Sequence, residues 1–102
     1  MPTVAEALQH LERELACSRQ AGCKVLKLIH GYGSSGAGGE IRIVVQKRLS
    51  EMATRGEIRA CIFGEDWSKS DERAWALINT HSELKQDADL GRRNLGITIV
   101  VL

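Results

Sequence analysis

The sequence of 102 residues predicts a single α/β domain, a two-layer sandwich in which a mixed sheet of three to four strands packs against helices. Two segments repeat apolar residues at the 3.6-residue spacing of a helix, three shorter segments are rich in β-branched residues, and the two kinds alternate along the chain. Strands joined through helices are expected to pair in parallel with right-handed crossovers. A chain of this length holds one core, so residues 1–102 are interpreted as one domain.

Two long helices are predicted. The first begins at Thr3, which forms a capping box with Glu6, and stops at Gly22. The second begins near Glu40 and stops at Gly56. Residues 43–45 are β-branched and could belong to a strand, but the polar residues that follow favour a helix. The apolar faces are Val4, Leu8, Leu11 and Leu15 in the first helix, and Ile41, Val44, Val45, Leu49 and Met52 in the second.

Three strands are predicted, over residues 24–29, 58–63 and 97–102. Their apolar side chains and those of the helices should form the core. The residues expected to be largely buried are Val25, Leu28, Ile41, Val45, Leu49, Ile62, Ile99 and Val101, with Leu8, Leu11 and Leu15 covering one face of the sheet.

Residues 64–96 are the least regular part of the chain. Ser68 or Ser70 could cap a short helix that carries Ala74, Leu77 and Ile78 on one side. Residues 85–94 are polar and are expected to form a surface loop.

Composition excludes several classes of protein. The formal net charge is +1, so no strong electrostatic attraction to nucleic acid is expected and any anion must be bound by local geometry. The three cysteines, Cys17, Cys23 and Cys61, lack metal-site spacing, and the last two are interpreted as small hydrophobic residues in or beside strands. No metal or cofactor is expected. No signal peptide or membrane span is visible in the sequence, which favours the cytoplasm.

Residues 30–39, the glycine-rich segment between the first strand and the second helix, are the predicted functional centre. Glycine lets a ligand approach the backbone closely, and a helix N-terminus offers free N–H groups to an anion. We therefore predict a phosphate site here, with Arg42 as a further charged contact. The residues expected to bind phosphate or nucleic acid are Gly31, Gly33, Ser34, Ser35, Gly36, Gly38, Gly39 and Arg42.

Two familiar phosphate motifs do not fit this segment. A P-loop requires Lys-Ser or Lys-Thr after its glycines, and neither follows here. A dinucleotide fold requires a longer chain and an acidic residue about 20 positions after the glycines, whereas Glu65 and Asp66 lie farther away.

His30 lies where the first strand ends, so its imidazole should face the bound anion. It could act as general acid or base on a phosphodiester, which makes it the candidate catalytic residue. It could instead hydrogen-bond the loop backbone. His10 and His81 are expected at the surface.

Four segments, in order, resemble the Smr (small MutS-related) domain family and together span nearly the whole chain. They are the helix start Thr3-Val-Ala-Glu-Ala-Leu8, the strand end His30-Gly-Tyr-Gly33, Ile41-Arg42 with Val45 and Leu49, and the last strand Gly96-Ile-Thr-Ile-Val100. The resemblance implies a β-α-β-α-β-β sandwich, similar to the C-terminal domain of bacterial translation initiation factor 3. It also implies binding, and often endonucleolytic nicking, of DNA or RNA.

The chain departs from that family in two ways. The family opens with a strand that carries L-D-x-H, whose acid and histidine are thought to belong to the nuclease centre, and this sequence starts after it. The connection over residues 64–94 is also longer and less basic. An absent first strand would leave a sheet edge open to a partner strand or to self-association.

Three hypotheses follow from the sequence. The first is a nucleic-acid-binding domain with possible nuclease activity at His30. The second is a noncatalytic protein-interaction domain. The third is a binder of small nucleotides or phosphate that uses the same glycine-rich segment.

Overall fold

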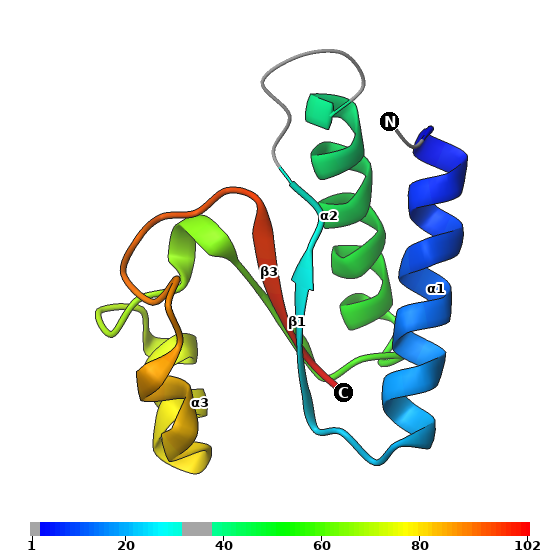
Figure 1. Ribbon diagram of the computed structural model, residues 1–102. Helices are drawn as coiled ribbons and strands as arrows, with labels where there is room; N and C mark the ends of the chain where they lie inside the picture. Colours follow the sequence, from blue (N-terminus) through cyan, green and yellow to red (C-terminus); the bar gives the residue numbers. More distant parts are fainter. Residues whose placement is uncertain (1–2, 32–37) are drawn as a thin grey trace.

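The computed structural model describes residues 3–31 and 38–102. Three α-helices, three strands and two short 3-10 helices follow one another in these residues (Figure 1). In chain order they are α1 (Val4–Gln20), β1 (Val25–Ile29), α2 (Gly38–Thr54), β2 (Ala60–Phe63), η1 (Gly64–Asp66), α3 (Glu72–Thr80), η2 (Ser82–Gln86) and β3 (Ile97–Val101).

The ends of α1 confirm the sequence signals. The Thr3 hydroxyl accepts a hydrogen bond from the Glu6 backbone N–H at 3.1 Å, and the Glu6 carboxylate accepts from the Thr3 backbone, which completes the capping box. After the helix, Gly22 has a φ of 76° and its N–H bonds the carbonyl of Arg19, while Cys23 bonds that of Ser18. This pair of bonds is a Schellman motif, which uses glycine because the position needs positive φ.

The sheet has the strand order β1-β3-β2, and β3 is antiparallel to both neighbours. The expected parallel pairing is therefore wrong. Strands β1 and β2 do run in the same direction, but β3 lies between them and takes the hydrogen bonds of both. The three-stranded sheet is purely antiparallel rather than mixed.

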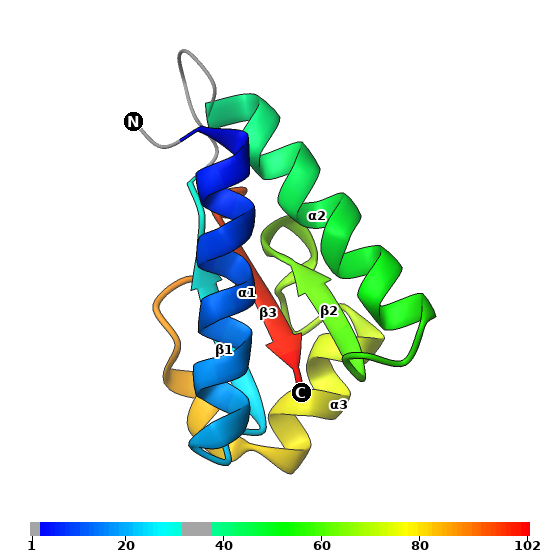
Figure 2. The same ribbon diagram turned by 90° about the vertical axis from the view of Figure 1, so that its right-hand side faces the viewer.

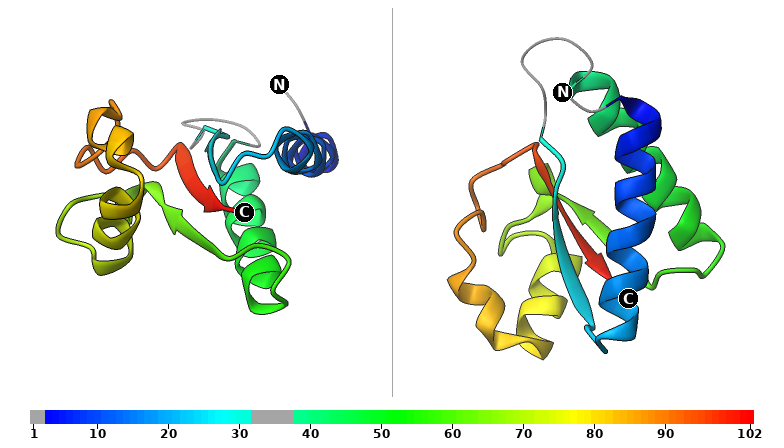
Figure 3. Two further views of the ribbon diagram at one scale, coloured as in Figure 1. Left: turned by 90° about the horizontal axis from the view of Figure 1, so that it is seen from below. Right: turned by 45° about the vertical axis from the view of Figure 1, so that its right-hand side comes forward.

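Helices α1 and α2 cover one face of the sheet, and α3 with η2 covers the other (Figures 2 and 3). The predicted α/β sandwich is confirmed, with a smaller helical layer added on the second face. Strand β3 lies in the middle and is buried on both faces, which explains why all of its residues except Thr98 are apolar. The first cluster is Leu11, Leu15, Leu28, Ile41, Val45, Leu49, Met52, Ile58 and Val100; the second is Ile62, Trp67, Ala74, Leu77, Ile78, Ile97 and Ile99.

Most of the predicted core is confirmed. All the expected strand and α2 positions are buried except Val25 and Val101, which are partly buried and pack against the second cluster. Leu8 is also only partly buried, although it contacts the first cluster. The interpretation of Cys23 as a strand-associated hydrophobic residue is wrong, because it follows the α1 cap and is exposed; Cys61 is half-buried in β2.

The predicted short helix is present as α3, but its cap differs from the expected one. Asp71 is the N-cap, and its carboxylate accepts from the backbone N–H groups of Arg73 and Ala74 at 2.9 and 3.0 Å. The hydroxyls of Ser68 and Ser70 bond each other instead, at 2.8 Å. A carboxylate also suits the positive end of the helix dipole, so it is the stronger cap.

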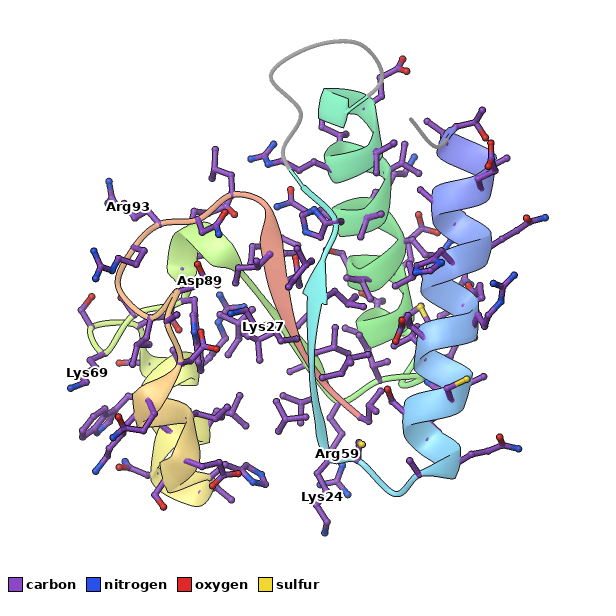
Figure 4. The ribbon with its side chains drawn as sticks, viewed as in Figure 1. Lys24, Lys27, Arg59, Lys69, Asp89 and Arg93 are labelled. Carbon is purple, nitrogen blue, oxygen red and sulfur yellow. The ribbon has the colours of Figure 1, made fainter. Side chains whose placement is uncertain are left out.

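Residues 85–94 are held more firmly than a polar surface loop would be. The carboxylate of Asp87 accepts hydrogen bonds from Lys27 Nζ and from the buried Trp67 Nε1, both at 3.0 Å. Lys27 also pairs with Asp89, and the side chain of Asn94 donates to Asp89 at 2.9 Å. In Figure 4 the labelled Lys27 and Asp89 point toward each other from β1 and from the segment after η2. These contacts tie the segment to the sheet.

No helix in the part of the chain that the structure describes is long and apolar enough to span a bilayer.

Candidate functional site

The candidate site lies where β1 ends and α2 begins. Gly33, Ser34, Ser35 and Gly36 lie outside the described residues, so the structure does not test their predicted phosphate contacts. Gly31 follows β1 with a φ of 76°, a conformation that favours glycine. Gly38 and Gly39 are the first two described residues of α2, and the predicted start near Glu40 falls inside the described helix.

His30 is half-buried and both of its ring nitrogens have partners. Nδ1 lies 2.7 Å from the Gly31 carbonyl oxygen, and Nε2 lies 3.0 Å from the hydroxyl of Thr98 on β3. A carbonyl only accepts, so Nδ1 carries the proton in the neutral ring and Nε2 accepts from the Thr98 hydroxyl. This arrangement fixes the tautomer and the orientation of the imidazole, and it agrees with the backbone-bonding role considered for His30.

The surroundings keep the imidazole neutral. Burial lowers the pKa of His30 from 6.5, and the positive charge of Arg42 lowers it further. The Gly31 carbonyl and the carboxylate of Glu65 act in the opposite direction, but burial dominates. At neutral pH the ring is therefore an uncharged hydrogen-bonding group.

Arg42 is near enough for its charge to act on His30, but it is already paired. Its Nη2 atom lies 3.3 Å from Oε2 of Glu65, and the other oxygen of that carboxylate accepts from Gln46 Nε2 at 3.3 Å. Nε of Arg42 is buried and has no hydrogen-bond partner among the described residues. The guanidinium is thus held by one carboxylate and keeps an unused donor.

Three further residues belong to this site and were not predicted from the sequence: Thr98, Glu65 and Gln46. Thr98 had a signal, since a hydroxyl in an apolar strand needs a partner if both faces of that strand are buried. Gln46 is one turn after Arg42 on α2, which places the two side chains on the same helix face. Glu65 reaches the site from η1 only because β2 ends beside β3, and the sequence does not reveal that placement.

A groove of about 670 Å³ lies beside the site, between α1 and β1. Its apolar floor is formed by Ala7, Leu11, Leu28, Ile41 and Val45, and His30 lies at its border. Residues of α1 form its rim: the charged Glu6, Arg13 and Glu14, together with His10.

No protein-family model, curated protein or solved structure matches this chain. The function is therefore inferred from the geometry and from the residues.

The other two histidines lie away from this site. His10 is exposed on α1, as predicted, and lies 3.8 Å from Glu14. His81 follows α3 and is partly buried rather than exposed, 3.7 Å from Glu83. Within residues 3–31 and 38–102, no three His, Cys, Asp or Glu side chains gather as a metal site requires.

Proposed function

We propose that this chain is a nucleic-acid-binding domain of Smr-like type, which holds a backbone phosphate at the N-terminal end of α2. The observation that carries the proposal is the state of Arg42. Arg42 is the fifth described residue of α2, its guanidinium is held by the single carboxylate of Glu65, and its buried Nε has no partner among the described residues. A phosphate that draws the guanidinium away from Glu65 and toward solvent would give this donor a partner, and the helix dipole would also attract the phosphate.

Glu65 would compete with the phosphate for Arg42. Binding then requires the guanidinium to leave the Glu65 carboxylate and pair with the phosphate. Until it does so, the negative charge of Glu65 repels the phosphate. We expect weak affinity and a shallow dependence on salt, because only one charged contact replaces counterions. Backbone N–H groups of the glycine-rich segment would supply the rest of the contacts.

The resemblance also implies nicking of DNA or RNA, with His30 as the proton-transfer group. In the geometry described above, both ring nitrogens are occupied, so His30 would have to release Thr98 or Gly31 before it could move a proton. The arrangement therefore favours a positioning role for His30. Nuclease activity is tested separately from binding.

The test measures binding of short fluorescent single-stranded DNA and RNA by anisotropy at two salt concentrations. Arg42→Ala should weaken binding. It should also reduce the slope of log affinity against log salt concentration by about 1, the value for one lost phosphate contact. Glu65→Gln should strengthen binding, because it removes the competing charge. Gly36→Val should weaken binding at least as much as Arg42→Ala.

The chain offers a matched control pair. Arg48, also on α2, forms an ion pair with Glu12 at 3.0 Å, outside the site. Glu12→Gln should leave affinity unchanged while Glu65→Gln raises it. Equal effects of the two substitutions would mean that only overall charge matters, and the site would then lie elsewhere.

Two further measurements separate the alternatives. Nicking of supercoiled plasmid or of structured RNA that is lost in His30→Ala would assign catalysis to this site. A thermal shift with free nucleotides, but no binding to oligonucleotides, would favour the small-ligand hypothesis.

A further inference from the structure

Strand β1 forms one edge of the sheet, and its hydrogen-bonding groups alternate in direction. The His30 N–H donates to the Gly96 carbonyl, and the Leu102 N–H donates to the Lys24 carbonyl, so the even-numbered residues face β3. Val25, Lys27 and Ile29 must then direct their N–H and C=O groups away from β3. Among the described residues, no hydrogen bond to these outward groups is present.

The outward groups of β1 face the groove, because the helical layer is wider than the sheet. Helix α1 packs beside α2, and α2 packs on β2. Two packed helices cover about 20 Å, whereas three strands cover roughly 14 Å, a difference of about one strand. Seen from below, α1 lies beyond β1 on the α2 side of the sheet (Figure 3). The groove of about 670 Å³ is the space beneath this overhang.

We propose that this groove binds an extended peptide segment of a partner protein, which pairs with β1 as a fourth strand. Alternate residues of the peptide would be apolar, because they would face the floor made by Ala7, Leu11 and Leu28. One residue on its other face would pack beside Ile29, which is 79% exposed. The groove rim carries both charge signs, so an uncharged segment fits best.

A second copy of this chain fits less well. Antiparallel pairing of two β1 edges has its largest overlap centred on Lys27, and this register places Lys27 opposite its own copy. The overhanging α1 of each copy would also occupy the space beside the other. The proposal does not depend on phosphate binding at Arg42.

Hydrogen exchange tests the proposal residue by residue. The probe is a blocked seven-residue peptide of alternating valine and threonine with a terminal lysine for solubility. In the full chain alone, the amides of Leu26 and Leu28 should exchange slowly and those of Lys27 and Ile29 quickly. With saturating peptide, the exchange rates of the Lys27 and Ile29 amides should fall by about tenfold or more. The same peptide with a central proline should give no protection, because it cannot complete the strand ladder.

Two pairs of variants locate the site. Ala7→Phe fills the groove and should weaken peptide binding about tenfold or more, whereas Ala5→Phe, exposed on the same helix, should not. Ile29→Thr keeps a β-branched residue but removes the apolar contact and should weaken binding, whereas Ile43→Thr on α2 should not. The second pair remains informative if Ala7→Phe fails to fold.

Three results would overturn the proposal. The first is saturating peptide that leaves the exchange of Lys27 and Ile29 unchanged. The second is protection of these amides without peptide that grows with protein concentration together with a doubled mass, which would assign the edge to self-association. The third is the same alternating protection produced by an oligonucleotide, which would assign the groove to nucleic acid.

Discussion

The Thr98 hydroxyl lies 3.0 Å from Nε2 of His30, and this hydrogen bond joins the central strand to the end of β1. Thr98 is fully buried, so its hydroxyl needs a partner inside the protein. A neutral imidazole with its proton on Nδ1 is a suitable acceptor. The protonation state of His30 is therefore coupled to the packing of β3.

This coupling predicts a pH dependence of stability. The pKa of His30 is lowered on folding, so the unfolded chain takes up the proton first as the pH falls. The contribution of neutral His30 is complete above the unfolded pKa of about 6.5 and is lost as the pH falls through the folded value. The urea midpoint should fall between pH 7 and pH 5, and His30→Gln should flatten this dependence. His10→Gln is the control, and an equal flattening in that variant would refute the assignment.

Asp87, which accepts hydrogen bonds from Trp67 and Lys27, should contribute more to stability than an exposed carboxylate such as Asp66. Asp87→Ala removes the acceptor of the buried Trp67 N–H, and an unsatisfied buried donor costs about 1–3 kcal/mol. Lys27 would keep Asp89 as a partner. Asp66→Ala, which removes an exposed ion pair with Arg73, should cost less than about 1 kcal/mol. Urea unfolding of both variants checks the difference, and similar losses would contradict this ranking.

Gly64 should tolerate no side chain. A Cβ atom there would lie 1.7 Å from the Asn94 backbone oxygen, and a backbone atom cannot move aside cheaply. Gly64→Ala should therefore destabilise the fold by about 3 kcal/mol or more, or prevent folding. At Gly39 no atom of the described residues lies within 4 Å of an added Cβ and the backbone is helical, so Gly39→Ala should be neutral or stabilise the protein by up to about 1 kcal/mol. Thermal unfolding measures both; normal stability of Gly64→Ala would show that this approach is wrong.

Leu49 lies in the middle of the first cluster and is fully buried. Leu49→Ala should lower the free energy of unfolding by about 2–5 kcal/mol, a large share for a small domain. Ile43 on the same helix is 60% exposed, so Ile43→Ala should change stability little. Equal losses in chemical denaturation would contradict the observed burial.

Local sequence signals predicted the helices well, but they did not predict the order of the strands in the sheet. The capping box at Thr3 and the glycines at 22 and 56 are contacts between near neighbours, so the sequence carries them directly. The antiparallel sheet depends on β3 lying between β1 and β2, and no local pattern encodes which strands are adjacent. The apolar residues on both faces of β3, interrupted only by Thr98, were the one available sign of a central strand.

The candidate site shows the same division. His30 and Arg42 were found because a strand end and a helix start are visible in the sequence. Thr98 and Glu65 come from residues far along the chain, and only the folded sheet brings them to the site. Thr98 hydrogen-bonds His30, and Glu65 pairs with Arg42. The sequence therefore predicted which residues lie at the site but not their hydrogen bonds and ion pairs.

The place of β3 in the sheet also has a consequence for biosynthesis. Strands β1 and β2 each pair only with β3 in the described structure, and Val25 pairs with Val101. Until residues 97–101 have left the ribosome, the earlier strands have no partner and their apolar side chains stay exposed. Pairing over such long sequence distances is slow, and unpaired strands are prone to aggregate. The nascent chain should therefore depend on chaperone protection until the last strand emerges.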